Sequence, residues 1–234
     1  MTNIGVLGGM GPAATVDFMS KLLACTPATC DQEHLPVIVA NLTQVPDRSA
    51  AILGQGPDPL PALLRGVDLL NSADVGVIVI PCNTSHHWYA EMSQASAAPI
   101  LHIAEACLQQ IHADASSLLL ATPGTLRSGF YQRALEARGL RWQLPIGHGE
   151  QQAVNECIRL VKAGEALAGS ARLAQVLEAA RRRGVDVAIL ACTELPIAAS
   201  HLGNHGLNAV DSTMELARAV VRHAIARGWQ RLCA

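Results

Sequence analysis

The chain has 234 residues, of which 50% are hydrophobic and 15% are charged, and its formal net charge is −2. This length allows one large domain or two lobes of about 100 residues each. The sequence shows no clustering of Lys and Arg on one face, which argues against nucleic-acid binding. No apolar run approaches the roughly 18 residues that a membrane-spanning helix needs. The seven cysteines are an odd number, which argues against a disulfide framework and favours a cytoplasmic protein.

Short apolar segments alternate with amphipathic ones along the chain. The apolar segments consist mainly of Val, Ile, Leu and Ala, as in strands covered on both faces. The predicted strands are Ile4–Leu7, Val37–Ala40, Val75–Ile80, Leu118–Ala121 and Val187–Ala191. The predicted helices are a segment starting near Pro12, then Leu60–Leu70, Ser128–Ala137, Gln151–Lys162, Arg172–Arg183 and Ser212–Ala226. This alternation predicts an α/β fold with parallel sheets.

The last helix has terminal signals at both ends. Ser212 and Glu215 have the spacing of a capping box, and Gly228 follows the end of the helix. The strand-like segment Asn208–Val210 precedes it. We expect this helix to return the chain to the first part of the fold.

A weak internal repeat predicts two similar lobes. A strand runs into a glycine turn and a helix near Gly11 and again near Gly124, and a strand ends at Cys82 and again at Cys192, at nearly the same offset. We expect each lobe to be a parallel sheet flanked by helices, with a pseudo-twofold axis relating the lobes and the active site between them. The first lobe would comprise residues 1–98 and 208–234, and the second residues 99–207.

Cys82 and Cys192 are the candidate catalytic residues. Each follows a strand and precedes a predicted helix start, and ligands of open parallel sheets bind beyond the carboxyl ends of the strands. Two facing lobes would therefore bring both thiols to one cleft from opposite sides. Racemisation removes a proton from one face of a carbon and returns one to the other face, which a thiolate and a thiol can do together.

Each cysteine taken alone is more simply interpreted as a packing residue, because free cysteine is among the most buried residue types. We interpret the remaining cysteines other than Cys30 in this way: Cys25, Cys107, Cys157 and Cys233. Only the repeated context, a strand end followed by polar residues, distinguishes Cys82 and Cys192.

At these positions the chain resembles the aspartate/glutamate racemase family, whose members work without pyridoxal phosphate. The matching segments, in the family's order and spacing, are Gly8–Pro12, Val45–Arg48, Pro81–His86, Lys162–Gly164 and Ala191–Glu194. The resemblance spans essentially the whole chain. It implies racemisation of aspartate, glutamate or both by Cys82 and Cys192, with no cofactor, no metal ion and a homodimeric assembly.

The resemblance also implies the substrate-binding residues. Met10, Asn83 and Thr84 lie where the family binds the α-substituents of the amino acid. Arg48 and Lys162 lie where members bind the side-chain carboxylate, and a guanidinium suits a carboxylate because it can donate two parallel hydrogen bonds. The expected set is completed by Ser85, Thr125 and Thr193.

Two features bear on substrate choice. Without the resemblance, Arg48 is more simply interpreted as an arginine in a surface loop, and Lys162 as a solvent-exposed residue at the end of a helix. The segment Leu144–Glu150 departs from the family's pattern, which leaves the choice between aspartate and glutamate open. Some members replace one cysteine with threonine, so the two cysteines here favour racemisation in both directions.

Other functions fit less well. Gly9, Gly11 and Ala14 match a dinucleotide-binding pattern, but Pro12 lacks the N–H that a phosphate needs, and Asn41 stands where a ribose-binding carboxylate is expected.

A metal site at Cys82, His86 and His87 lacks a strong zinc spacing. Among related enzymes, the second cysteine disfavours an arylmalonate decarboxylase, and Arg48 with Lys162 disfavours a hydantoin racemase. A maleate isomerase stays an alternative, as does an amino-acid-binding module with idle cysteines.

Overall fold

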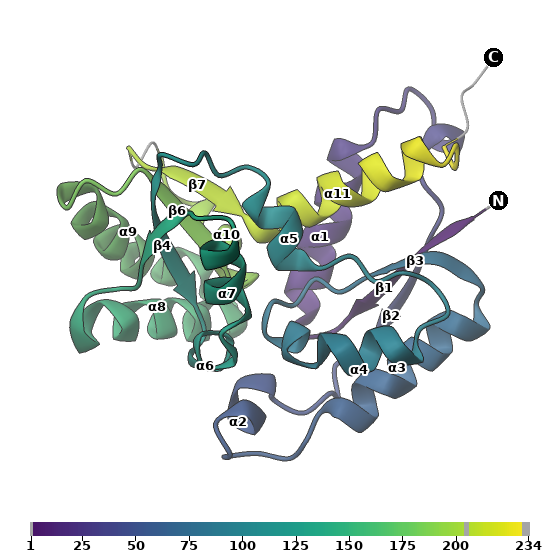
Figure 1. Ribbon diagram of the computed structural model, residues 1–234, viewed down its shortest axis with the longest axis horizontal. Coiled ribbons are helices and arrows are strands. Elements are labelled where there is room, and N and C mark those ends of the chain that lie inside the picture. Colours follow the sequence, from purple (N-terminus) through teal and green to yellow (C-terminus); the bar gives the residue numbers. More distant parts are fainter. Residues whose placement is uncertain (1, 204–205, 231–234) are drawn as a thin grey trace.

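The structure is a computed structural model that describes residues 2–203 and 206–230. Figure 1 shows two lobes, each built on a parallel sheet. The first sheet has the order β2-β1-β3, with β1 (Asn3–Gly8), β2 (Val37–Asn41) and β3 (Val75–Val79). The second has the order β5-β4-β6-β7, with β4 (Ser116–Ala121), β5 (Arg141–Gln143), β6 (Val187–Ala191) and β7 (Asn208–Asp211). The predicted α/β class with two parallel sheets is confirmed.

Helices cover both sheets. Those around the first sheet are α1 (Pro12–Cys25), α2 (Arg48–Ile52), α3 (Leu60–Ser72), α4 (Tyr89–Ala95) and α11 (Ser212–Ala226), with the short 3₁₀ helices η1 (Asp31–Glu33) and η2 (Thr84–Trp88). Those around the second are α6 (Pro123–Ser128), α7 (Phe130–Ala137), α8 (Gly147–Lys162), α9 (Ala166–Arg182) and α10 (Glu194–Ala199). The helix α5 (Ile103–Leu108) contacts both α11 and α7. Within the described residues, none of the helices has the length and apolarity that a membrane crossing requires.

Both faces of the strands β1, β3, β4 and β6 are buried, which explains why these strands are nearly continuously apolar. In β1, Ile4 and Val6 pack with Phe18 of α1 on one face, whereas Leu7 packs with Leu63 of α3 on the other. In the second lobe, α8 and α9 cover one face of the sheet and α5 and α7 the other. The alternation of side chains along a strand assigns successive residues to opposite cores.

Several predicted boundaries differ from the structure. The predicted helix Ser128–Ala137 is split by Gly129, whose φ of 73° is a left-handed conformation that suits glycine. Helices α8 and α9 begin earlier than predicted, at Gly147 and Ala166. The helix start predicted directly after Cys192 is α10. The short elements α2, α4, α5 and β5 have no counterpart in the sequence analysis, because so few residues carry no clear periodicity.

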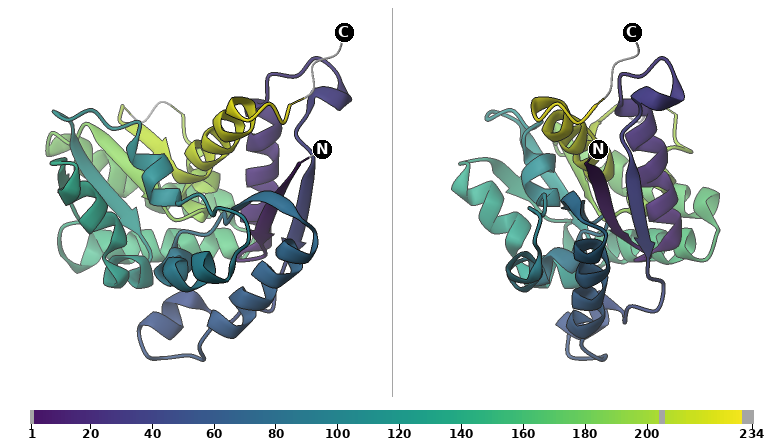
Figure 2. Two further views of the ribbon diagram at one scale, coloured as in Figure 1. Left: turned by 45° about the vertical axis from the view of Figure 1, so that its right-hand side comes forward. Right: turned by 90° about the vertical axis from the view of Figure 1, so that its right-hand side faces the viewer.

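The strand β7 belongs to the second sheet. Its residues pair with β6, for example Val210 with Ile189, although we had assigned this segment to the first lobe. The chain returns to the first lobe only with α11, which packs beside α1 (Figure 2). The wider division of the chain into lobes stays a prediction.

The N-cap of α11 is Asp211 and not Ser212. The Asp211 carboxylate accepts hydrogen bonds from the backbone N–H groups of Thr213 (2.9 Å) and Met214 (3.0 Å). The Ser212 hydroxyl instead donates to the Leu190 carbonyl (2.8 Å). The predicted capping box is therefore wrong, because the carboxylate at the end of β7 reaches the free amides first.

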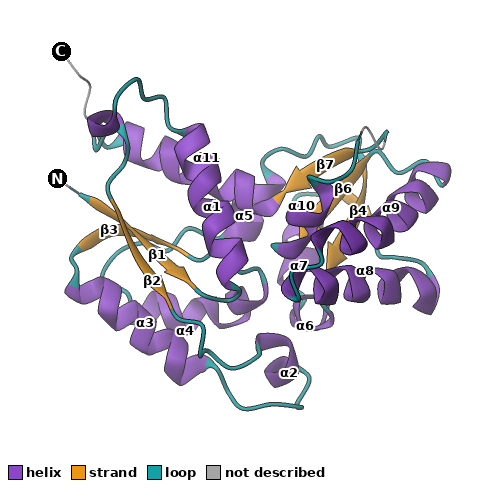
Figure 3. Ribbon diagram, turned by 180° about the vertical axis from the view of Figure 1, so that it is seen from behind, coloured by secondary structure: helices purple, strands orange, loops and turns teal. Residues whose placement is uncertain are grey.

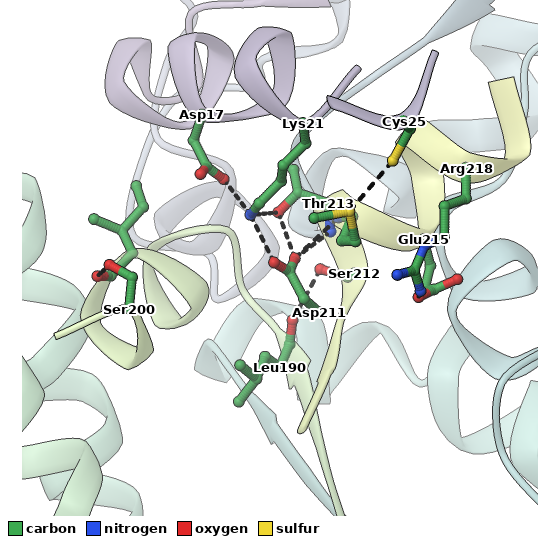
Figure 4. Close-up of polar contacts among 12 residues, drawn as sticks. Asp17, Lys21, Cys25, Leu190, Ser200, Asp211, Ser212, Thr213, Glu215 and Arg218 are labelled. Atoms are coloured by element: carbon green, nitrogen blue, oxygen red, sulfur yellow. Dashed lines mark hydrogen bonds and ion pairs between the residues drawn. The ribbon is translucent and has the colours of Figure 1, made fainter. Parts of the chain in front are cut away.

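Asp211 also connects the two lobes. The ammonium of Lys21 on α1 lies 2.5 Å from the Asp17 carboxylate and 2.6 Å from the Asp211 carboxylate (Figure 4). The Lys21 side chain is only 12% exposed. One largely buried cation thus joins α1 to the point where β7 becomes α11.

We predict that Asp211→Ala lowers the free energy of unfolding by about 1–3 kcal/mol, because it removes a helix cap and one partner of a half-buried ion pair. Urea denaturation measures this loss. The control is Glu178→Ala, which removes only the solvent-exposed ion pairs with Arg181 and Arg182. That variant should lose less than about 1 kcal/mol. Equal losses in the two variants would contradict the assignment.

Candidate active site

Cys82 and Cys192 line one cavity between the lobes. Cys82 follows β3 and Cys192 follows β6, so both thiols lie beyond the carboxyl ends of their strands. The cavity has a volume of about 20 Å³, room for one water molecule. Its other lining residues are Met10, Asp47, Arg48, Ser49, Asn83, Thr84, Thr122, Lys162, Thr193 and Glu194.

The lining includes every residue predicted for the site except Ser85 and Thr125. Both of these are fully buried behind the lining. Ser85 Oγ donates to the Cys82 carbonyl (2.8 Å), and Thr125 Oγ1 lies 2.9 Å from Thr84 Oγ1. They therefore hold lining residues in place.

Four lining residues were not assigned a role from the sequence. Asp47 and Glu194 stand inside the motifs that contain Arg48 and Cys192, so their position was visible but not their orientation. Ser49 and Thr122 lie at the starts of α2 and α6, which pack against each other and lie next to each other in Figure 3. Only the packing of these two helices brings them to the cavity.

His86 fixes the position of Cys82. Its Nδ1 donates to the Cys82 carbonyl (2.9 Å), and its Nε2 accepts from the N–H of Ile103 (3.2 Å). Both ring nitrogens are therefore engaged by the backbone, which leaves neither for a metal ion. Burial, with a smaller contribution from His102, lowers the pKa of His86 to about 3. The ring is thus neutral at physiological pH.

Asn83 belongs to a buried chain of hydrogen bonds that links the two lobes. The single proton of the Ser212 hydroxyl goes to the Leu190 carbonyl, so this hydroxyl must accept from Asn83 Nδ2 (3.0 Å). The amide oxygen of Asn83 then faces Tyr131, whose hydroxyl donates to it (2.7 Å). One N–H of Asn83 is left for a ligand in the cavity.

Three threonine hydroxyls form a buried triangle across the two lobes. Thr122 Oγ1 accepts from the N–H of Thr125 and donates to Thr125 Oγ1 (3.0 Å). Thr84 Oγ1 lies 3.0 Å from Thr122 Oγ1 and 2.9 Å from Thr125 Oγ1. If Thr125 donates to Thr84, the proton of Thr84 can turn toward a ligand.

Arg48 is buried and organises the loops around the cavity. Its Nη1 donates to the carbonyls of Val45 (3.1 Å) and Pro46 (2.9 Å), and its Nη2 donates to the carbonyl of Met10 (3.2 Å). Its Nε has no partner among the described residues. A guanidinium carries five donors, so the Nε–H and one N–H of Nη2 remain available.

The surroundings of Cys192 are negatively charged. Its thiol donates to the Glu194 carboxylate (3.0 Å), which also accepts from the Thr193 hydroxyl (3.1 Å). Burial and the charge of Glu194 raise the pKa of Cys192 well above its ordinary value. At Lys162, desolvation favours the neutral amine, but the charges of Glu194, Cys192 and Asp47 outweigh it and raise the pKa.

The packing of α2 against α6 narrows one side of the cavity. A side chain on Gly124 would place its Cβ only 2.6 Å from Ser49 Cα, so glycine is what allows this approach. An amino acid is several times larger than the one water molecule that fits. Binding of an amino acid therefore requires the cavity to widen.

The thiols differ in their bonding state. Cys82 and Cys192 are free, as are Cys25, Cys107 and Cys157. Cys30 is disulfide-bonded, which contradicts the expectation drawn from the cysteine count, because an odd number excludes only complete pairing. Cys233, which the sequence analysis interprets as a packing residue, lies outside the described residues.

With this geometry established, the chain can be compared with known proteins. The family model "Asp/Glu/Hydantoin racemase" matches residues 7–220. The chain belongs to this family. As racemases are isomerases, the expectation that the protein is an enzyme of this class is confirmed.

Individual relatives agree with this assignment. The chain is 30% identical to the broad specificity amino-acid racemase RacX of Bacillus subtilis, with 93% of this chain and 96% of that protein covered. It is 28% identical to the aspartate racemase of Picrophilus torridus, with a TM-score of 0.86 and coverage of 100% and 96%. A glutamate racemase of Francisella tularensis, 16% identical over 100% of this chain and 84% of that one, has a TM-score of 0.70 and shares the fold.

We predict that the free energy of unfolding decreases as the pH falls from about 6.5 toward 3, because His86 then binds a proton in the unfolded chain but not in the folded protein. The slope from this residue is about 1.4 kcal/mol per pH unit. His86→Gln cannot titrate, so its slope in this range should be smaller. Urea denaturation at several pH values measures both proteins, and parallel slopes would contradict the assignment.

Proposed function

We propose that the protein racemises an acidic amino acid, aspartate or glutamate or both, by a two-base mechanism. The observation that carries this proposal is that two free thiols, from strand ends in different lobes, line one small cavity. One group as thiolate removes the α-proton, and the other as thiol returns a proton to the opposite face. The reverse reaction exchanges the two roles. Membership of the racemase family supports the reaction class.

In this mechanism Asn83 and Thr84 bind the α-carboxylate. Asn83 has one N–H that its neighbours leave unused, and the Thr84 hydroxyl can donate to a ligand when Thr125 donates to it. Both residues follow Cys82 in the chain. Negative charge spreads onto the α-carboxylate as the proton leaves, so donors held in place stabilise the transition state more than the substrate. Met10 and Thr193 complete the wall around the α-carbon.

Arg48 and Lys162 bind the side-chain carboxylate in this proposal. The unpartnered Nε of Arg48 supports this role, because a buried donor without a partner gains most from a ligand oxygen. Lys162 supplies a second charge from α8 in the other lobe. A carboxylate between the two cations would connect the lobes as the cavity closes. A homodimeric assembly and a cytoplasmic location stay predictions.

We predict that the purified protein, without added cofactor, exchanges the α-proton of L-aspartate, L-glutamate or both for deuterium in D₂O and forms the D-enantiomer. Proton NMR follows the exchange, and chiral chromatography follows the enantiomers. Neutral and basic amino acids define the breadth of specificity, and maleate tests the isomerase alternative. If no amino acid in the panel gains deuterium, the proposal is wrong.

We predict that Cys82→Ser and Cys192→Ser each reduce racemisation by at least about 10³-fold, because each removes the acid/base group of one face. Deuterium exchange without inversion should survive from one enantiomer in one variant and from the other enantiomer in the second. The control is Cys107→Ser, a buried thiol outside the cavity. Undiminished turnover in either active-site variant would exclude the two-base scheme.

A further inference from the structure

Glu194 is placed directly against the thiol of Cys192 and is 5% exposed. Its Oε2 accepts the hydrogen bond of the thiol (3.0 Å) and that of the Thr193 hydroxyl (3.1 Å). Its Oε1 faces the other lobe, since a Cβ built on Gly11 would lie 3.7 Å from it. The carboxylate is therefore held between the sulfur and the backbone of the first lobe.

The two thiols of the site are not equivalent in this respect. The structure shows no carboxylate hydrogen-bonded to the Cys82 sulfur within its described residues, whereas Cys192 donates to one. A carboxylate accepts a hydrogen bond from a thiol but repels a thiolate. Both interactions are strong when the sulfur and the carboxylate oxygen are about 3 Å apart. Glu194 thus distinguishes two cysteines that the internal repeat makes look alike.

We propose that Glu194 holds the transferable proton on Cys192, so that Cys192 enters the reaction as the acid and Cys82 as the base. This inference rests on the two-base function proposed above. Glu194 acts here as a positioning residue for Cys192, because it contacts the sulfur that donates the proton and need not touch the substrate.

The proton count follows from this arrangement. The Cys82 thiolate takes the α-proton and becomes a thiol. The Cys192 S–H bond breaks as its proton passes to the opposite face of the α-carbon, and the electron pair stays on the sulfur beside Glu194. In the reverse direction that thiolate takes the α-proton, which restores its hydrogen bond to Glu194.

Other charged or titratable groups around Glu194 and Cys192 also affect the equilibrium between the thiol and the thiolate of Cys192. They are Lys162 and Cys157 on α8, Asp47 and Arg48 at α2, Tyr131 on α7, and Cys82 itself. The charge of Lys162 and the backbone N–H of Glu194 both favour the Cys192 thiolate. Lys162 offsets the charge of Glu194 during the half of the cycle in which Cys192 is deprotonated.

The test is a pH titration of single active-site thiols by their thiolate absorbance in the ultraviolet. Cys82→Ser is compared with Cys82→Ser/Glu194→Gln, and Cys82→Ser/Cys192→Ser supplies the background of the remaining cysteines. Glutamine can still accept the hydrogen bond but carries no charge. The titration midpoint of Cys192 should fall by about 1–2 pH units when Glu194 becomes glutamine.

The matched control is the same substitution in a Cys192→Ser background, where the midpoint of Cys82 should not move. An unchanged midpoint of Cys192, or an equal shift at Cys82, would overturn the inference. Glu194→Asp keeps the charge but shortens the reach to the sulfur, so it should give an intermediate midpoint even where the glutamine variant does not fold.

These outcomes are independent of the proposed function. If the wild-type protein racemises no amino acid, the two-base function fails, whatever the titration shows. If the wild-type protein racemises aspartate or glutamate but substitution of Glu194 leaves the titration midpoint of Cys192 unchanged, only the inference about Glu194 fails.

Discussion

The site depends on a fixed distance between two strand ends that lie in different sheets. The buried chain from the Leu190 carbonyl through Ser212 and Asn83 to Tyr131 supplies this constraint. It joins the residue that follows Cys82 to a residue two positions before Cys192. Because these groups are buried, breaking a link can leave a polar group unpaired, at a cost of about 1–3 kcal/mol.

Further polar contacts and close packing surround the cavity on both sides of this chain. The chain through Ser212 lies at the start of α11, which is packed on α1 and held there by the ion pairs of Lys21. On the other side of the cavity, α2 meets α6 at Ser49 and Gly124 by close packing. The start of α6 is in turn tied to Thr84 of the first lobe by the threonine triangle.

The sequence predicted the parts of this arrangement that depend on local pattern. The strand ends, both cysteines and most of the lining follow from apolar periodicity, the internal repeat and the resemblance to racemases. What could not be predicted depends on contacts between distant segments. The membership of β7 in the second sheet, the cap at Asp211 and the placement of Ser85 and Thr125 behind the lining are decided by packing that no local window contains.

The charges in the cavity limit what can determine substrate choice. Arg48 and Lys162 are balanced by Asp47 and Glu194, so the lining has no surplus of positive charge before a thiolate is counted. A second carboxylate on the substrate is therefore not attracted by net charge. In the proposed function, its recognition then depends on directed donors that the fold leaves unused, such as the Nε–H of Arg48. Small changes in the loops that hold this guanidinium would alter specificity without altering the thiol pair.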